Sequence, residues 1–121
     1  EAALVRVAES QAGFVICFDQ DAKYDSPNFL WFRERYERFL YVDRIAVDAT
    51  TGLKGVGSAL YDAVAYWAAQ AAYPLICAEV NTDPPNPGSL AFHAKRGFEA
   101  AGDAYLEGRG KSVRYLVRRV E

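Results

Sequence analysis

The segment that most constrains this chain is a glycine-rich turn between a predicted strand and a predicted helix. Gly52, Gly55 and Gly57 follow the apolar run 41–47 and precede a pattern with apolar residues at helical spacing. The first turn of a helix has unpaired backbone N–H groups and the positive end of the helix dipole, and residues without side chains let a phosphate reach these donors. The segment therefore predicts a binding site for an anionic, phosphate-bearing ligand.

Two common phosphate-binding loops do not fit this segment. A Walker-type loop has lysine and then serine or threonine after its last glycine, whereas Ser58 follows Gly57 directly. A dinucleotide-binding loop has a further glycine three residues beyond Gly57, where this chain has Leu60. The pattern that remains is Gly-x-x-Gly-x-Gly from Gly52, for which an ordinary glycine-containing helix start is the alternative.

A second segment predicts a short helix with both ends specified. Asn86 is a favourable N-cap, and Pro87 suits the first helical position, where a missing N–H is not needed. Gly97 suits the left-handed residue that ends the helix, and Phe98 can pack back on its last turn. His93, the only histidine of the chain, lies within this helix.

Together the two segments resemble the acyl-CoA-binding motifs of the GNAT N-acetyltransferase superfamily. The first motif usually begins with arginine or glutamine, where this chain has Gly52, a change that removes a side chain but no backbone donor. The second is commonly Asn-x-x-Ala/Ser-x-x-Phe/Leu-Tyr-x-x-x-Gly-Phe, and His93 stands at its tyrosine. The similarity covers roughly residues 4–120 and looks closest to a largely uncharacterised branch with a Tyr-Asp-Ser-Pro-Asn-Phe-x-Trp-Phe stretch, here 24–32.

The resemblance implies that acetyl-CoA is the acyl donor. Its pantetheine amides would pair with an exposed strand edge as a false strand, and its diphosphate would bind the glycine-rich turn. Asn86 would contact the pantetheine arm, and Lys54 would contact either a phosphate or only solvent. The expected contacts are Ile45, Ala46, Val47, Gly52, Leu53, Lys54, Gly55, Val56, Gly57, Ser58, Asn86, Ser89 and Phe92.

The implied chemistry is direct transfer of the acetyl group to a primary amine in a ternary complex. This reaction needs a base for the ammonium, a donor for the tetrahedral oxyanion and an acid for the departing thiolate. The oxyanion donor would be the backbone N–H of Ile45 or Ala46. Because the family's tyrosine is the acid, the resemblance gives that role to His93; the alternative is a half-exposed histidine that only bonds a neighbour.

The base is expected among two carboxylates. Asp43 and Glu79 lie on the two predicted strands that flank the cleft, and Asp43 shares a strand face with Tyr41 and Ile45. A buried carboxylate beside an apolar cleft has a raised pKa suited to accepting a proton. Asp43 could instead pair with Arg44 or another cation and only hold the sheet.

An unusually aromatic connection precedes the central strand. Phe29 and Phe32, three residues apart, would dock a short helix on the sheet. The same connection could instead shape the pocket for the acceptor amine, carried by a small molecule or a peptide end. The side chains expected to contact the acceptor are Tyr24, Asn28, Trp31, Tyr41 and Asn81.

The hydrophobic patterns alternate between strands and helices and predict one α/β (α+β) domain over residues 1–121. Strands are expected over 4–8, 12–18, 39–47, 75–80, 99–104 and 112–120, and helices over 28–36, 55–72 and from Asn86. The first two strands would be joined by a turn at 9–11 and the last two would form a hairpin. The resemblance implies the GNAT fold, a mixed, mostly antiparallel sheet with a splayed parallel central pair, whose N-terminal elements are missing here.

Composition limits the partners and the compartment. The net charge of −2 gives no basic field for nucleic acid. No apolar run approaches the ~18 residues of a membrane span and no signal-peptide pattern opens the chain, so we expect a cytoplasmic protein without a membrane partner. Cys17 and Cys77 lie in apolar strand patterns and are expected to be buried free thiols. No metal is expected, and the final strand or the aromatic connection could support a homodimer.

Two other hypotheses remain open. The chain could be a non-catalytic CoA-binding module, or a binder of nucleotide phosphates unrelated to acyl transfer. The first predicts CoA binding without turnover on any amine. The second predicts affinity for ATP or NAD and none for CoA.

Overall fold

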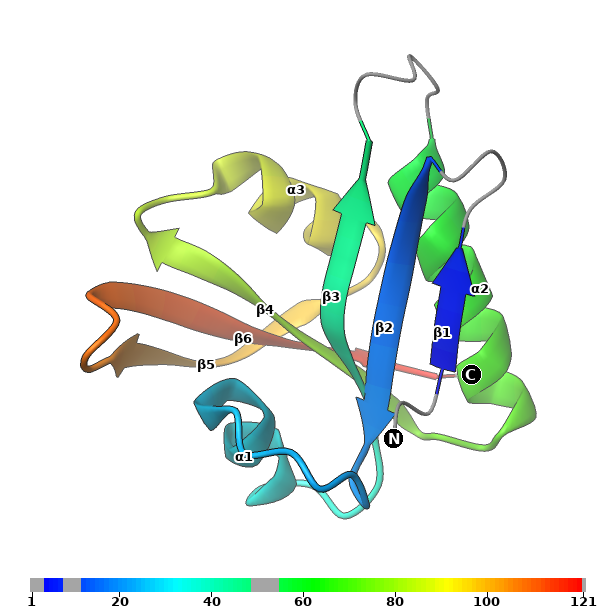
Figure 1. Ribbon diagram of the computed structural model, residues 1–121, viewed down its shortest axis with the longest axis horizontal. Helices are drawn as coiled ribbons and strands as arrows, with labels where there is room; N and C mark the ends of the chain where they lie inside the picture. Colours follow the sequence, from blue (N-terminus) through cyan, green and yellow to red (C-terminus); the bar gives the residue numbers. More distant parts are fainter. Residues whose placement is uncertain (1–3, 8–11, 49–54, 121) are drawn as a thin grey trace.

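The computed structural model describes residues 4–7, 12–48 and 55–120, and a mixed sheet forms the centre of this part of the chain (Figure 1). The sheet has six strands in the order β1-β2-β3-β4-β6-β5. The elements in chain order are β1 (Leu4–Val7), β2 (Gly13–Asp19), α1 (Pro27–Arg33), β3 (Leu40–Val47), α2 (Val56–Gln70), β4 (Leu75–Asp83), α3 (Pro87–Lys95), β5 (Glu99–Leu106) and β6 (Lys111–Arg119).

The expected fold class is confirmed, and the elements differ from the sequence prediction only in their ends. α1 ends at Arg33, before the predicted residue 36, where the Arg35 N–H bonds the Phe32 carbonyl three residues back instead of the carbonyl four residues back that an α-helix would use. β4 continues to Asp83, beyond the predicted residue 80, because it pairs with β6 as far as Ser112. The predicted turn at 9–11 lies outside the described residues.

The central strands β3 and β4 are parallel, and they separate soon after they meet. Their pairing is limited to Leu40 with Ile76 and Tyr41 with Cys77. Beyond these pairs β3 follows β2 as far as Val47, while β4 follows β6. The two strands therefore diverge towards their carboxyl ends, as Figure 1 shows, and the expected splayed pair is confirmed.

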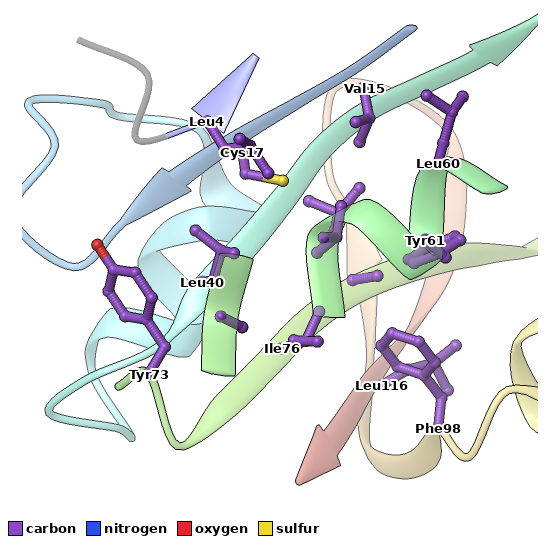
Figure 2. Packing of buried hydrophobic residues seen from close by; sticks show 14 of the residues in the cluster. Leu4, Val15, Cys17, Leu40, Leu60, Tyr61, Tyr73, Ile76, Phe98 and Leu116 are labelled. Atoms are coloured by element: carbon purple, nitrogen blue, oxygen red, sulfur yellow. The ribbon is translucent and has the colours of Figure 1, made fainter. Parts of the chain in front are cut away.

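The helices cover opposite faces of the sheet. Because strand side chains alternate, Leu40 and Ile76 pack with Leu60 of α2 on one face, the cluster drawn in Figure 2. Tyr41 and the cysteine next to Ile76 belong to the other cluster, which contains α1. None of the helices in the described residues is long and apolar enough to cross a membrane.

α1 is held by the two aromatic residues that the sequence singled out. Phe29 and Phe32 are completely buried against the sheet. Their rings meet Tyr41 at centroid distances of 5.6 and 5.7 Å. The prediction that these residues dock the helix is confirmed.

Both cysteines are buried free thiols, as expected. Burial raises the pKa of the Cys17 thiol to about 12, and burial likewise raises the pKa of Cys77. Because the thiolate is the reactive form, neither cysteine is suited to nucleophilic chemistry.

The close approach of β2 to β3 gives a test of the register. A Cβ atom at Gly13 would lie 2.5 Å from the Ala46 carbonyl oxygen and 3.3 Å from the Val47 Cα. Both atoms belong to a backbone held in place by strand pairing, so they cannot move aside cheaply. Gly13→Ala should lower the free energy of unfolding by about 1–3 kcal/mol, measured by urea denaturation.

Gly88→Ala is the matched control for this substitution. Gly88 lies in α3, and nothing is within 4 Å of its added Cβ atom. Alanine also has the higher helix propensity, so this variant should be as stable as the wild type or more so. A Gly13→Ala protein as stable as the Gly88→Ala protein would contradict the packing described.

Candidate active site

A cavity of about 230 Å³ lies where β3 and β4 diverge. β3 and β4 form two of its sides, and α2 and α3 contribute the rest. Its lining residues are Val42, Asp43, Arg44, Ile45, Tyr61, Ala78, Glu79, Ser89 and His93. The cavity thus brings together the three side chains that the sequence proposed for catalysis, Asp43, Glu79 and His93.

The two carboxylates of the cavity are each held by a tyrosine. The Tyr41 hydroxyl donates to Glu79 Oε1 at 2.7 Å, and the Tyr24 hydroxyl donates to Asp43 Oδ1 at 2.7 Å. Among the described residues no ion pair involves Asp43, so the alternative in which it pairs with Arg44 is not what the structure shows. The two tyrosines fix the direction in which the carboxylates face the cavity.

Glu79 has an environment suited to a proton acceptor. Burial is the largest effect and raises its pKa from 4.5 to about 7, and the negative charge of Asp43 acts in the same direction. The hydrogen bond from Tyr41 and the positive charge of Lys111 oppose this rise in the pKa. A carboxyl group with a pKa near neutrality can take up a proton and release it again at physiological pH.

His93 is buried and both of its ring nitrogens have partners. Its side chain is 5% exposed, which differs from the half-exposed histidine of the alternative. Nδ1 lies 2.8 Å from the Ser89 carbonyl oxygen, and Nε2 lies 2.6 Å from the Tyr61 hydroxyl. A carbonyl oxygen can only accept, so Nδ1 carries the hydrogen, and Nε2 of the neutral ring accepts from Tyr61. Burial lowers the pKa of His93, which favours this neutral form.

The first turn of α2 presents backbone donors, as the glycine pattern predicted. Gly55 is the N-cap residue and has a φ of 77°, a left-handed conformation that favours glycine. In this described part of the turn no side chain caps the helix and no acidic residue lies in its first turn. The N–H groups at Val56, Gly57 and Ser58 therefore have no capping side chain. The predicted contacts Gly52, Leu53 and Lys54 lie outside the described residues.

The start of α2 lies close to both β3 and α3. A Cβ atom at Gly57 would be 3.5 Å from the Phe92 ring and 3.8 Å from Val47 Cγ2. The structure thus brings together three residues that the resemblance assigned to the same ligand. Val47 is also 46% exposed, so this end of β3 faces outward.

β3 offers an open backbone edge beyond its short contact with β4. In the described residues the pairing of β3 with β4 ends at Tyr41, and Ile45, Ala46 and Val47 pair only with β2. An exposed strand edge can pair with an extended ligand through main-chain hydrogen bonds. This arrangement fits the predicted false strand.

α3 begins and ends as predicted. Asn86 Oδ1 accepts a hydrogen bond from the Ser89 N–H at 3.2 Å, and Pro87 occupies the first turn. Gly97 has a φ of 89°. These ends fix the direction of the helix, which carries Ser89 and His93 into the cavity wall.

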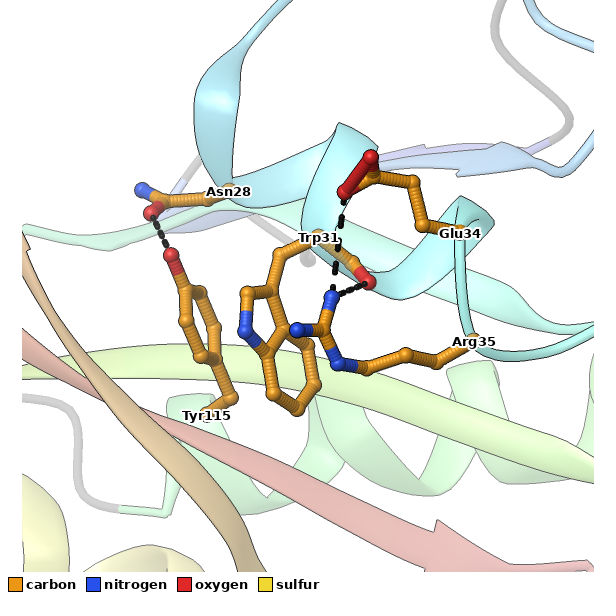
Figure 3. A network of polar contacts seen from close by, with 5 residues as sticks. All are labelled: Asn28, Trp31, Glu34, Arg35 and Tyr115. Carbon is orange, nitrogen blue, oxygen red and sulfur yellow. Dashed lines mark hydrogen bonds and ion pairs between the residues drawn. The ribbon is translucent and has the colours of Figure 1, made fainter.

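Two of the side chains expected to contact the acceptor pack elsewhere (Figure 3). Asn28 Oδ1 accepts from the Tyr115 hydroxyl at 2.9 Å, and the Trp31 ring stacks on Tyr115 with centroids 4.2 Å apart. The Arg35 guanidinium lies 3.9 Å from the Trp31 ring centroid. Asn28 and Trp31 lie outside the cavity lining and fasten α1 to β6. Asn81 also lies outside the lining, on the β4 face that carries Glu79.

The comparison with family models decides the classification. The model of the acetyltransferase (GNAT) family matches residues 4–98. The chain belongs to the GNAT family. No curated protein sequence matches it.

Solved acetyltransferase structures share the GNAT fold of this chain at low identity. The ribosomal-protein-S18-alanine N-acetyltransferase from Escherichia coli is 15% identical, with a TM-score of 0.68 over 100% of this chain and 72% of that one. The NatC complex bound to Gag peptide and CoA is 14% identical, with a TM-score of 0.68 over 91% and 62%. Nourseothricin acetyltransferase is 21% identical, with a TM-score of 0.66 over 97% and 64%. The chain thus spans between 62% and 72% of the length of these three proteins.

The residue of this GNAT site that sequence reasoning missed is Tyr61. It lines the cavity from α2 and is 1% exposed, with its hydroxyl on His93. In the sequence Tyr61 follows Leu60 and lies between the apolar residues of a helical pattern, so the pattern predicts only that it packs in the core. The only available signal was its phenol, because a buried tyrosine hydroxyl usually has a partner.

The environment of Glu79 gives a prediction on proton affinity. Its pKa in the folded protein should be about 7, measured by ¹³C NMR titration of the side-chain carboxyl. In Tyr41→Phe the pKa should rise further, because the lost hydrogen bond stabilises the charged form. Tyr73→Phe, which removes a hydroxyl that donates to Asp19, should leave Glu79 unchanged. A wild-type Glu79 that titrates near 4.5 would contradict the burial described.

Proposed function

We propose that this GNAT protein transfers an acetyl group from acetyl-CoA directly to a primary amine in a ternary complex. The observation that carries the proposal is the cavity between the diverging strands, because two carboxylates, a phenol and an imidazole line the same cavity. Tyr61, Ser89 and His93 reach it from the helical face of the sheet. Asp43 and Glu79 reach it with their tyrosine partners from the face of α1. A thioester and an amine that enter from opposite faces would meet between the strands.

The proposed acetyl-CoA site consists mainly of backbone hydrogen-bonding groups. The N–H groups of Gly55, Val56, Gly57 and Ser58 at the start of α2 would bind the diphosphate, with Gly52, Leu53 and Lys54 as the preceding part of the loop. The edge of β3 at 45–47 would pair with the pantetheine amides. Asn86, Ser89 and Phe92 would contact the pantetheine from α3. In the part of the chain that the structure describes, the start of α2 has no capping side chain and the edge of β3 beyond Tyr41 has no strand partner, and both observations support this assignment.

Glu79 is the proposed general base. The acceptor arrives as an ammonium ion, and Glu79, with a pKa of about 7, would remove a proton so that the nitrogen can attack. Asp43 lies close enough to raise the pKa of Glu79 by its charge, and the same charge would attract the ammonium. The backbone N–H of Ile45 or Ala46 would stabilise the oxyanion of the tetrahedral adduct. The thiolate would receive its proton on the side of the cavity that Tyr61 and His93 line.

The proposed acceptor is an aliphatic amine of a small molecule or a peptide end. The two carboxylates favour a cation, and the cavity has room only for the reactive end of a larger molecule. The structures named above include a ribosomal-protein-S18-alanine N-acetyltransferase and nourseothricin acetyltransferase. None of the five expected acceptor contacts, Tyr24, Asn28, Trp31, Tyr41 and Asn81, is in the cavity lining. Tyr24 and Tyr41 would contact the acceptor beside the carboxylates to which they donate, and Asn28, Trp31 and Asn81 would do so without such a link.

The test is release of CoA thiol from acetyl-CoA by the full-length protein with a panel of primary amines. Release should depend on the amine, and Glu79→Gln should lower kcat/KM by about 10²-fold or more. Because the base must be deprotonated, wild-type kcat/KM should rise with pH and level off above about 7. Glu99→Gln, on the exposed start of β5, is the control and should keep full activity.

Binding measurements separate this proposal from its alternatives. Calorimetric titration should show CoA binding to the wild type and to Glu79→Gln with similar affinity. Tight CoA binding without turnover on any amine would instead support a non-catalytic CoA-binding module. Affinity for ATP or NAD and none for CoA would contradict the donor site.

A further inference from the structure

A single hydrogen bond joins two cavity residues that come from different helices. The Tyr61 hydroxyl of α2 lies 2.6 Å from Nε2 of His93 on α3. Nδ1 of His93 is committed to the Ser89 carbonyl at 2.8 Å, so the ring has its hydrogen on that side. Nε2 then has no hydrogen to give, and the mobile proton of the pair is on Tyr61.

We propose that Tyr61 gives its hydroxyl proton to the departing CoA thiolate, and that His93 is a positioning residue that holds the Tyr61 hydroxyl in the cavity. This inference rests on the proposed acetyl transfer and replaces the direct role that the sequence resemblance gave to His93. It adds a residue from α2 to the catalytic side chains, which the sequence analysis took only from β3, β4 and α3.

The packing around Tyr61 fixes its ring and oxygen, and only the hydroxyl hydrogen can change direction. Its ring lies 5.2 Å from the His93 ring, 5.8 Å from Phe92 and 5.6 Å from Phe98, measured between centroids. These neighbours fix the position of the oxygen at the cavity wall. The O–H bond can still rotate about the C–O bond, from His93 towards a sulfur atom in the cavity.

The groups around the pair set the protonation states that this step requires. The groups that face Tyr61 are His93 from α3, Arg96 directly after α3, Cys17 from β2 and Glu79 from β4. Burial is the largest effect and raises the pKa of Tyr61, while burial lowers the pKa of His93. Near neutral pH Tyr61 therefore keeps its proton and the imidazole is a neutral acceptor.

The proton balance of the reaction closes with water as the only further participant. The C–N bond forms as the amine attacks the thioester carbonyl, and the C–S bond breaks as the adduct collapses. The nitrogen loses one proton to Glu79 and one to water. The sulfur gains the Tyr61 proton, and the Tyr61 oxygen takes a proton back from water. When Glu79 returns its proton to solvent, each turnover has released one proton.

The test compares substitutions at Tyr61 and at His93 in the full-length protein, with Tyr73→Phe as the control. Tyr61→Phe should lower kcat by about 10²-fold, in the range of general acid catalysis, with KM for acetyl-CoA and the Kd of CoA unchanged. His93→Ala should lower kcat less, because the hydroxyl remains but is no longer held. His93→Gln should recover part of that loss, because the glutamine oxygen can accept from Tyr61. Tyr73→Phe removes another partly buried tyrosine hydrogen bond and should keep full activity.

Several results would overturn the inference. Full kcat in Tyr61→Phe would do so, and so would a larger loss in His93→Ala than in Tyr61→Phe. If the hydrogen bond between Tyr61 and His93 only joins α2 to α3, both variants should have a lower melting temperature and a normal kcat, and this result would also overturn the inference. If the wild type binds CoA but transfers no acetyl group, the proposed function itself has failed, and with it the role of Tyr61.

A second measurement does not depend on the stability of Tyr61→Phe. A fluorinated tyrosine at position 61 keeps the ring and the hydroxyl but has a lower phenol pKa. If Tyr61 is the acid, the loss of kcat at alkaline pH should begin at lower pH than in the wild type. An alkaline limb that does not move would contradict the proposal.

Discussion

The short pairing between β3 and β4 is the constraint on which the rest of the structure depends. Each strand pairs more extensively with an antiparallel partner on its outer side than with the other central strand; the partner is β2 for β3 and β6 for β4. After Tyr41 and Cys77 the two central strands follow these partners and separate. Within residues 4–7, 12–48 and 55–120, the separation leaves an open backbone edge on β3 and a cavity that α2 and α3 close from one side. The candidate site is thus a consequence of sheet topology.

The polar groups of the cavity are costly to bury, and their partners explain how the fold tolerates them. A buried carboxylate favours its neutral form, so the pKa of Glu79 rises, and the Tyr41 hydroxyl limits that rise. On the helical face, Tyr61 and His93 satisfy each other and the Ser89 carbonyl accepts the remaining ring hydrogen. Hydrogen-bonded groups of this kind keep a defined geometry in a core. The same arrangement would place the proton acceptor and the proton donor of the proposed acetyl transfer on opposite sides of the cavity.

Much of the fold could be predicted from local patterns, because the start and end of a helix or strand depend on residues that are near neighbours in the chain. The helix from Pro87 has its N-cap, its first-turn proline and its terminal glycine in the sequence, and the structure uses all three. The site was predicted less completely, since a hydrogen bond between distant residues leaves no periodic signal. Tyr61 has the spacing of a core residue, and only the approach of α3 reveals its contact with His93. The sequence leaves open whether the aromatic connection docks a helix or shapes the acceptor pocket, and the stacking of Trp31 on Tyr115, far along the chain, is visible only in the structure.

The central claim is that the diverging strands and the start of α2 form one binding site for CoA. Titration of the isotopically labelled protein with CoA, followed through its backbone amide NMR signals, tests this claim residue by residue. The account predicts saturable shifts at Ile45, Ala46 and Val47 on β3, at Val56 to Ser58 on α2 and at His93 on α3. Shifts confined to other surfaces, such as β5 or α1, would contradict it, and so would the absence of any shift at saturating CoA.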